Sequence, residues 1–234
     1  MNILFLIPSL DLGGSERQLV ELAKGLHQRG HEVTVAVFHG QGALEGELRE
    51  AGVTLIDLHM GSRWQFLGLL WRLLALLRAR SPRIIYGCLG TPNLFTVLLK
   101  PWFPEIRMVW GVRSSRTDLD RCGWSWRACH RVESRLARFA DLVISNSAAG
   151  LERAVASGFP RATLRVVPSG INVERFYPDA QAGAAVRAQW DLRRDHCLIG
   201  LVGRLDPRED HPVFLRAAAL LASPAYYPHH SPGR

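Results

Sequence analysis

Residues 3–18 read ILFLIPSLDLGGSERQ, and this stretch decides the fold. An apolar run ends at Pro8, a polar loop carries the adjacent Gly13 and Gly14, and a helical pattern follows. Such a junction leaves backbone N–H groups free beside the positive end of a helix. It can hold a phosphate or diphosphate, because glycines let a ligand approach the backbone closely. A strand–loop–helix turn that binds nothing explains the same spacing, so both interpretations stay open at this point.

The predicted helix begins at a capping box formed by Ser15 and, three residues later, Gln18. Leucine and alanine recur at helical spacing from position 19 to position 26, and Gly30 ends the pattern. The loop lacks the G-x-G-x-x-G fingerprint, and no acidic residue follows the predicted second strand, where His39 and Gly40 stand instead. A nicotinamide-dependent oxidoreductase is therefore the least favoured alternative.

The composition is that of a globular protein of one or two domains, with 234 residues, 47% of them hydrophobic and 21% charged. The net charge of +8 favours phosphate-bearing ligands, nucleic acid or anionic lipid. Because the chain has no block of basic residues, no zinc-finger spacing and no RNA-binding signature, we expect no nucleic-acid partner. Four scattered cysteines without C-x-x-C, and a first strand without the basic start of a signal peptide, predict reduced thiols in a cytoplasmic protein.

Strand-like and helix-like patterns alternate along the chain and predict an α/β fold, a Rossmann-like doubly wound parallel sheet. Further strands are expected at residues 33–38, 53–58, 84–86, 108–112, 142–145 and 164–167. Helices are expected between them at residues 44–51, 64–80, 94–102, 126–139 and 149–157. Ligands of such sheets bind at the carboxyl ends of the strands, which is where Gly13 and Gly14 are expected.

The chain changes character near residue 168, where a Pro-Ser-Gly turn begins. We expect a first domain at residues 1–168, an interdomain linker with a helix at 169–196, and a strand–loop–helix unit at 197–222 with its strand at 197–202. One strand and one helix cannot bury a core, so this second domain is expected to be truncated. Residues 223–234 are rich in proline, histidine and tyrosine and are expected to be a disordered tail.

Residues 66–77 are apolar except for Arg72, and further arginines lie near them at positions 63, 78, 80 and 83. The stretch is too short and too interrupted to span a bilayer. It reads either as a sheet-packing helix with a solvated arginine face or as a basic, aromatic helix on an anionic membrane surface. Both interpretations stay open, and the second predicts peripheral membrane contact.

Four segments in order resemble the GT-B glycosyltransferases, and within them glycosyltransferase family 4. The opening ILFLIPSLDLGGSERQLVELAKGLHQRGHEVTV is similar to that family's first strand, glycine loop and first helix. DLVISNSAAG at 141–150 resembles its last strand of the first domain, and VVPSGINVERFYP at 166–178 its interdomain segment. LVGRLDPREDHPVFLRAA at 201–218 resembles the start of its second domain. The resemblance extends over residues 1–222.

The resemblance implies two Rossmann-like domains, the first holding an acceptor and the second a nucleotide-sugar donor. It implies a retaining transfer that needs no metal and no cofactor, in which cations and backbone amides stabilise the departing diphosphate. The implied partners are a nucleotide-sugar donor and a polysaccharide or lipid-linked acceptor. The implied location is the cytoplasm, at the inner face of the membrane.

On the donor side, Gly13 and Gly14 match the family's loop that faces the donor phosphates, and Arg204 matches the arginine that pairs with the diphosphate. The family places a lysine a few residues later, where this chain has Glu209 with Arg208 beside it. Arg208 is therefore the candidate to replace that lysine. The family's Asn-Gly between domains reads Ser-Gly here at 169–170, and its paired-glutamate motif does not occur within these residues.

On the acceptor side, the resemblance points to Arg113 and Ser114 after a predicted strand, with Arg113 suited to an anionic acceptor. Asn93 either hydrogen-bonds substrate or caps the next helix. Asn146 and Ser147 either line the cleft or form a turn. No side-chain grouping identifies a catalytic nucleophile or a metal site.

These observations predict a family 4-like glycosyltransferase whose 234-residue chain is incomplete and inactive by itself. The alternative is a non-catalytic acceptor-binding half, or a split-enzyme subunit that needs a separate second domain.

Overall fold

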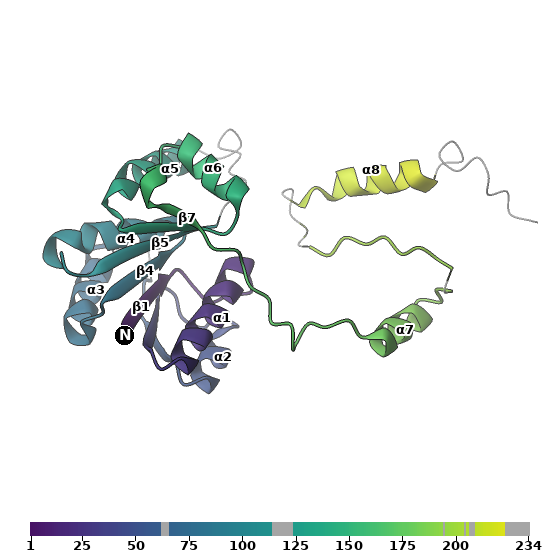
Figure 1. Cartoon of the computed structure of the whole chain (residues 1–234), viewed down its shortest axis with the longest axis horizontal. Coiled ribbons are helices and arrows are strands. Elements are labelled where there is room, and N and C mark those ends of the chain that lie inside the picture. The colour runs from purple at the N-terminus through teal and green to yellow at the C-terminus, as the bar shows by residue number, and fades with distance from the viewer. Residues whose placement is uncertain (62–65, 114–123, 194, 204, 206–208, 223–234) are drawn as a thin grey trace, which may run out of the picture. The chain divides into compact units, whose positions relative to one another are not determined.

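The computed structural model describes residues 1–61, 66–113, 124–193, 195–203, 205 and 209–222 (Figure 1). The chain divides into two compact units, Met1–Ile171 and Asn172–Arg234. The first unit contains the sheet and carries the predicted acceptor side. The predicted domain boundaries themselves stay predictions.

The first unit is built on a seven-stranded sheet in the order β3-β2-β1-β4-β5-β6-β7, with every neighbouring pair parallel. The strands are β1 (Asn2–Ile7), β2 (Glu32–Val37), β3 (Thr54–Asp57), β4 (Ile84–Cys88), β5 (Arg107–Val112), β6 (Leu142–Ser145) and β7 (Leu164–Val166). The order reverses at β1, which lies between β2 and β4. The predicted doubly wound parallel sheet is confirmed.

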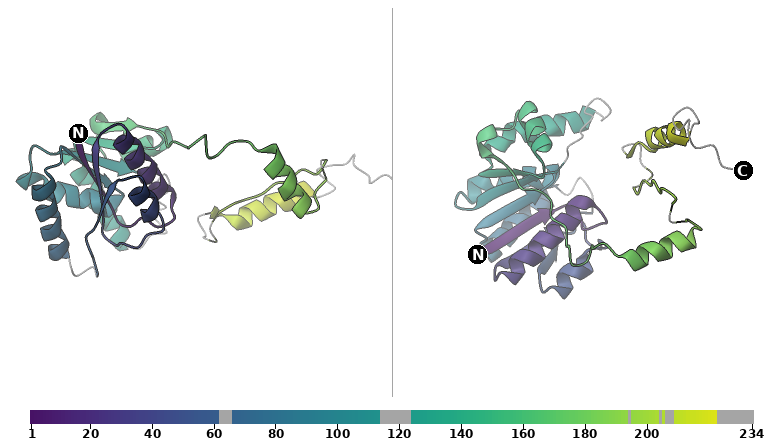
Figure 2. Two further views of the ribbon diagram at one scale, coloured as in Figure 1. Left: turned by 90° about the horizontal axis from the view of Figure 1, so that it is seen from below. Right: turned by 45° about the vertical axis from the view of Figure 1, so that its right-hand side comes forward.

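Helices cover both faces of this sheet. They are α1 (Gly14–Gln28), α2 (Glu45–Glu50), α3 (Phe66–Arg80), α4 (Gly90–Leu99), α5 (Trp124–Leu136) and α6 (Ala148–Ala156), with 3₁₀ turns η2 (Lys100–Trp102), η3 (Ala137–Phe139) and η4 (Arg161–Thr163). Helices α1 and α2 lie side by side in both views of Figure 2.

Separate cores form on the two faces of the sheet, because alternate residues of a strand point to opposite faces, and a third cluster packs around Trp110 of β5 and Val143 of β6. Phe5 and Ile7 of β1 pack in one core with Leu19 of α1. Leu4 and Leu6 pack in the other core with α3 and α4. Since both faces are covered, the strands read as continuous apolar runs, which made them easy to predict.

The predicted capping box is wrong. The N-cap of α1 is Gly13, which has no side chain to form a capping hydrogen bond. Ser15 lies inside the helix. The side chain of Gln18 instead contacts the backbone of Gly170. Helix α4 begins at Gly90, before the predicted residue 94, because the chain turns into the helix directly after β4.

The described part of the second unit contains α7 (Ala180–Gln189) and α8 (His211–Ala222). The strand predicted at residues 197–202 is wrong, because these residues form no strand and Val202 is fully exposed. A strand needs a neighbour for its backbone N–H and C=O groups, and no described residue supplies one here. The tail predicted at 223–234 lies outside the described residues. No described helix is long and apolar enough to cross a membrane.

Candidate functional site

The carboxyl ends of the strands meet at one edge of the sheet, and the loops that follow β1, β4, β5 and β6 lie there. The switch in strand order at β1 lies at the same edge, and it is where open parallel sheets bind ligands. In the loop after β1, Gly13 is half-buried and Gly14 is exposed. The glycines are thus accessible to a ligand.

The loop after β1 is held in place by the segment that follows β2. The N–H of His39 donates to the carbonyl of Pro8 at 2.9 Å, and the N–H of Leu44 donates to the carbonyl of Leu10 at 2.9 Å. Gly42 packs so closely that a Cβ there would lie 2.4 Å from the carbonyl carbon of Leu10. The loop is therefore preorganised.

The first turn of α1 begins in this loop, and Gly14 opens the helix. Free N–H groups and the helix dipole give this end a positive character. Glu16 occupies part of it, since a Cβ on Gly13 would lie 2.2 Å from Oε2 of Glu16. The Glu16 carboxylate thus lies at the end of the helix where the sequence predicts a phosphate. This position of Glu16 was not predicted from the sequence.

Arg113 stands one residue after β5 and is half-buried. Its guanidinium lies close enough to the hydroxyl of Tyr86 and the thiol of Cys88, both on β4, to lower the pKa of each group. Its Nε atom is buried and has no hydrogen-bond partner among the described residues. The absence of a side chain on Gly111 makes room, because a Cβ there would lie 2.5 Å from the Tyr86 hydroxyl.

These groups perturb one another electrostatically. Burial raises the pKa of Tyr86 to about 12, the charge of Cys88 adds to the rise, and Arg113 opposes it. Burial raises the pKa of Cys88 to about 11, Arg113 opposes the rise, and the charge of Glu16 adds to it. Because Glu16 and Arg113 both act on the same thiol, the first turn of α1 and the end of β5 are close. We call Glu16, Tyr86, Cys88 and Arg113 the edge cluster.

The edge cluster was only partly visible in the sequence. Arg113 was predicted, whereas Glu16, Tyr86 and Cys88 were missed. The available signals were the position of Glu16 in the first helical turn and the spacing of two residues between Tyr86 and Cys88, which places both on one face of β4. The cluster contains a guanidinium whose buried Nε–H has no partner among the described residues, and such a group can donate to an anion that reaches it.

Asn93 is fully buried in α4 rather than at the edge. Its Nδ2 donates to Oε1 of Glu133 at 2.9 Å, while its Oδ1 has no described partner. The N-cap of α4 is Leu89, so the prediction that Asn93 caps the helix is wrong. Contact with a substrate stays a prediction, and it requires the buried amide to become accessible.

Asn146 and Ser147 follow β6 and are half-buried. Ser147 is the N-cap of α6, and its Oγ accepts a hydrogen bond from the N–H of Gly150 at 3.0 Å. The hydroxyl of Ser145 donates to the carbonyl of Ser147 at 3.0 Å. The turn interpretation therefore describes the local structure, and contact with a ligand stays a prediction for both residues.

Three predicted site residues, Ser114, Arg204 and Arg208, lie outside the described residues. Among the described residues of the second unit, the Glu209 carboxylate lies against Gly203, where a Cβ would be 3.3 Å from its Oε2 atom. Within the described ranges, no group of three histidine, cysteine, aspartate or glutamate side chains is arranged to hold a metal ion.

Comparison with solved structures shows the same fold in several sugar-metabolising proteins. HepE from Anabaena, solved with UDP, superposes with a TM-score of 0.78 at 21% identity, covering 94% of this chain and 58% of HepE. Sucrose-phosphate synthase from Thermosynechococcus elongatus gives 0.72 at 19% identity, covering 94% and 60%. A glycosyltransferase from Rickettsia africae gives 0.70 at 15% identity, covering 94% and 57%. The chain thus spans less than two thirds of each of these proteins.

Sequence comparison gives the family. A search of curated proteins found no match. The family model described as Glycosyltransferase Family 4 matches residues 12–175, which include the glycine loop, the edge cluster and the end of the first unit. The chain therefore belongs to glycosyltransferase family 4.

Proposed function

We propose that this protein transfers a sugar from a nucleotide-sugar donor to an acceptor, with the carboxyl edge of the first unit as part of its site. Family membership supports the reaction class. The observation that carries the proposal is the open first turn of α1 at Gly14 together with the fixed guanidinium of Arg113, both acting at the switch point of the sheet. HepE, which shares the fold, binds UDP and UDP-glucose.

Breaking the bond between sugar and diphosphate builds negative charge on the leaving phosphate. Backbone N–H groups at the start of α1 are oriented to stabilise such charge before it forms. The Glu16 carboxylate opposes an anion at that place, so we expect its flexible side chain to rotate away when a diphosphate binds. Gly14 has no atom within 4 Å of its Cβ position, which leaves the approach open.

Arg113 supports an anionic or phosphate-bearing acceptor. Its guanidinium acts on Tyr86 and Cys88, and its buried Nε–H, which has no partner among the described residues, is a donor that an anion can satisfy once it becomes accessible. The proposed acceptor is accordingly a polysaccharide or a lipid-linked glycan, held at the inner face of the membrane. We further propose that transfer retains the anomeric configuration, needs no metal ion, and uses Arg204 and Arg208 to hold the donor phosphates.

We expect the 234-residue chain to turn over little or no donor by itself. In the described part of the second unit, the apolar residues 198–202 form no strand, and Val202 is fully exposed. This favours the second candidate function, a non-catalytic acceptor-binding half that acts with a separate donor-binding domain. The first unit, with its seven-stranded sheet and buried cores, is suited to that role.

Titration calorimetry of the 234-residue chain with UDP and UDP-glucose tests the phosphate site. Gly14→Ala should fold normally and weaken binding about tenfold, corresponding to about 1.4 kcal/mol, because the new methyl group obstructs the helix end. The matched control is Gly25→Ala in the same helix, whose Cβ would meet only the tip of Arg29 at 3.4 Å. Equal affinities of both variants would exclude the helix end as the phosphate site.

Release of sugar from a panel of nucleotide sugars separates the two candidate functions. Little or no turnover by the chain alone, restored by adding a donor-binding domain, supports the acceptor-binding half. Substantial turnover by the chain alone would show that the expectation of inactivity is wrong. Binding of no nucleotide sugar, together with no turnover under either condition, would contradict the proposed transfer.

A further inference from the structure

One buried carboxylate of the first unit belongs to neither the glycine loop nor the edge cluster. Glu45 opens α2, and its side chain is only 6% exposed. The other buried polar side chains of the described residues are uncharged, so Glu45 differs from them. Taking a carboxylate out of water costs free energy unless hydrogen bonds and an ion pair compensate for it. The partners of Glu45 therefore indicate its role.

The Glu45 carboxylate has two partners close to it in the chain. Its Oε1 accepts a hydrogen bond from the N–H of Gly42 at 3.1 Å, and the N–H of Glu45 donates to the carbonyl of Gly42 at 3.1 Å. Its Oε2 accepts from the guanidinium of Arg49 at 2.8 Å. The two bonds with Gly42 are reciprocal, as in a capping box, so Glu45 holds this residue through both of its backbone polar groups.

Gly42 is the point at which the segment after β2 meets the glycine loop. Because it has no room for a side chain, only its backbone sets how closely it approaches Leu10. The N–H of Leu44, two residues later, donates to the carbonyl of Leu10 at 2.9 Å. Leu10 is fully buried and stands three residues before Gly13. The position of Gly42 is thus passed to the start of the glycine loop by direct contacts.

Helix α2 also holds the other end of the glycine loop. Nη1 of Arg17 in α1 donates to both carboxylate oxygens of Glu47 at 2.6 Å. Helices α1 and α2 accordingly lie side by side in both views of Figure 2. Helix α2 is thus tied to both ends of the loop, through Glu45 to its start and through Glu47 to α1, where the loop ends.

We propose that Glu45 is a positioning residue of the phosphate site, which holds the loop after β1 in place for an anion. This inference rests on the proposed function, since it takes the start of α1 as the place where the donor phosphates bind. The side chain is too buried to touch a ligand, so it acts through Gly42 and Leu10. Backbone N–H groups stabilise an anion well only where they are held in the required geometry before it binds.

Three variants of the 234-residue chain test the proposal. Glu45→Met keeps the length of the side chain and removes both oxygens, which leaves the buried N–H of Gly42 without an acceptor. Glu45→Ala removes the same oxygens and replaces Glu45→Met if that variant does not fold. Glu45→Gln keeps an acceptor for Gly42 and loses only the ion pair with Arg49.

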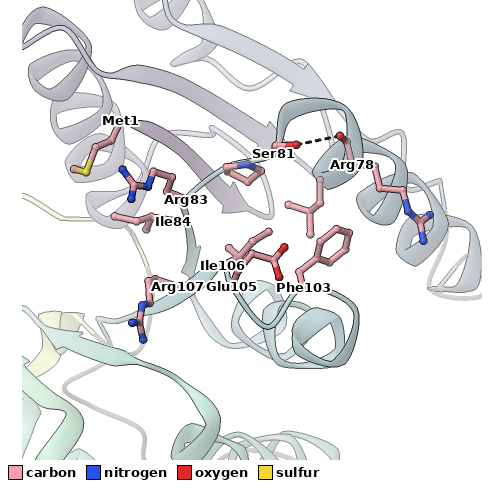
Figure 3. A pocket seen from close by; sticks show the side chains of 11 residues that line it. Met1, Arg78, Ser81, Arg83, Ile84, Phe103, Glu105, Ile106 and Arg107 are labelled. Atoms are coloured by element: carbon pink, nitrogen blue, oxygen red, sulfur yellow. Dashed lines mark hydrogen bonds between the residues drawn. The ribbon is translucent and has the colours of Figure 1, made fainter.

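The control for a general loss of stability is Ile106→Val. Ile106 is buried at the amino edge of the sheet, where it lines a pocket of about 800 Å³ (Figure 3). None of the residues that hold the glycine loop lines this pocket. Ile106→Val removes one buried methyl group and should lower the urea midpoint without acting on the loop.

Hydrogen–deuterium exchange read by NMR measures the positioning itself. In Glu45→Met, the Leu44 amide should exchange about two- to tenfold faster relative to the amides of β1, as expected for the loss of one hydrogen bond. Glu45→Gln should restore slow exchange, and Ile106→Val should leave the ratio unchanged. An unchanged ratio in Glu45→Met would overturn the proposal, because Glu45 would then not hold the segment against the loop.

Titration calorimetry with UDP measures the consequence for the site. Glu45→Met should raise the dissociation constant about fivefold, whereas Glu45→Gln and Ile106→Val should stay within about twofold of the original chain. Equal losses of affinity in Glu45→Met and Ile106→Val would show an effect of stability alone and overturn the proposal. Absence of UDP binding by the original chain would contradict the proposed function and the role in phosphate binding. Exchange at Leu44 would still report separately whether Glu45 holds the loop.

Discussion

Gln18 and Gly170 are joined by two hydrogen bonds although 152 residues separate them in the chain. Nε2 of Gln18 donates to the carbonyl oxygen of Gly170 at 2.6 Å, and the N–H of Gly170 donates to Oε1 of Gln18 at 2.9 Å. The amide side chain therefore pairs with a backbone as a neighbouring strand does. It fastens the end of the first unit to the helix that begins at the glycine loop.

Gln18→Ala should release this segment while leaving the sheet intact. Because these hydrogen bonds are exposed, we expect the substitution to lower the free energy of unfolding by at most about 1.5 kcal/mol. Hydrogen exchange of the Gly170 amide should become faster, because its acceptor is removed. The measurement is hydrogen–deuterium exchange read by NMR at Gly170.

Gln18→Glu is the informative partner variant. A carboxylate still accepts from the N–H of Gly170 but cannot donate to its carbonyl. Exchange at Gly170 should then lie between that of the original chain and that of Gln18→Ala. An unchanged exchange rate in Gln18→Ala would show that the contact does not order the segment.

Gly42→Ala should disturb the glycine loop through its backbone. A Cβ at this position would lie 2.4 Å from the carbonyl carbon of Leu10, and backbone cannot move aside cheaply. We expect a loss of about 2–4 kcal/mol in unfolding free energy, as for severe overpacking. Urea unfolding monitored by circular dichroism gives the value.

Gly46→Ala is the matched control, four residues away. It lies inside α2 with no atom within 4 Å of its Cβ position, so alanine should stabilise the chain by about 0.5–1 kcal/mol through helix propensity. The two substitutions add the same methyl group with opposite expected signs. Equal effects would contradict the assignment of Gly42 as a close backbone contact.

The fold could be predicted because the apolar pattern of each strand is contained in a few consecutive residues. Strands buried on both faces read as apolar runs, and β6 begins and ends where the sequence predicts it, at Leu142–Ser145. The run at residues 197–202 has the same apolar character but forms no strand. Propensity records which residues suit a strand, whereas pairing depends on a neighbour that the local sequence does not contain.

The candidate site was less predictable because its contacts are distant in sequence. Topology alone places Gly13 and Arg113 at the same edge, since Arg113 directly follows β5 and Gly13 lies in the loop after β1. The predicted hydrogen-bond partners of the side chains were wrong. Spacing predicted Gln18 as part of a capping box, but its side chain contacts Gly170. Asn93 was predicted either to contact substrate or to cap a helix, and its amide donates to Glu133. Spacing cannot distinguish a local partner from a distant one.

The stability of the fold at acidic pH should depend on whether the Asp141 carboxylate is ionised. Burial raises its pKa, but hydrogen bonds from Lys100, the Met108 N–H and Arg107 outweigh burial, so its pKa lies below the usual 3.8. A lowered pKa stabilises the fold above the unfolded value of 3.8, and this contribution is lost as the pH falls below it. Because the carboxylate is partly exposed and solvent screens its charge, Asp141→Asn should cost only about 0.5–1 kcal/mol near neutral pH.

The difference in unfolding free energy between Asp141→Asn and the original chain should shrink as the pH falls below the pKa of the free carboxyl group. Urea unfolding over a pH series measures it. Glu152→Gln is the control, because its ion pair with Arg161 is exposed on both sides and should contribute almost nothing. A pH-independent difference would show that Asp141 acts through packing rather than charge.

Cys88 should resist alkylation in the native chain, in contrast to the exposed Cys197. Cys88 is fully buried and its pKa is raised from 9.0 to about 11, so at pH 8 only about one thiol in a thousand is ionised. Iodoacetamide labelling, read by mass spectrometry of the two peptides, should modify Cys197 first. In denaturant the two rates should converge, because burial then protects neither thiol. Native labelling of Cys88 as fast as Cys197 would mean that the edge cluster is open to solvent, and the fixed position of Arg113 over β4 would then have to be abandoned.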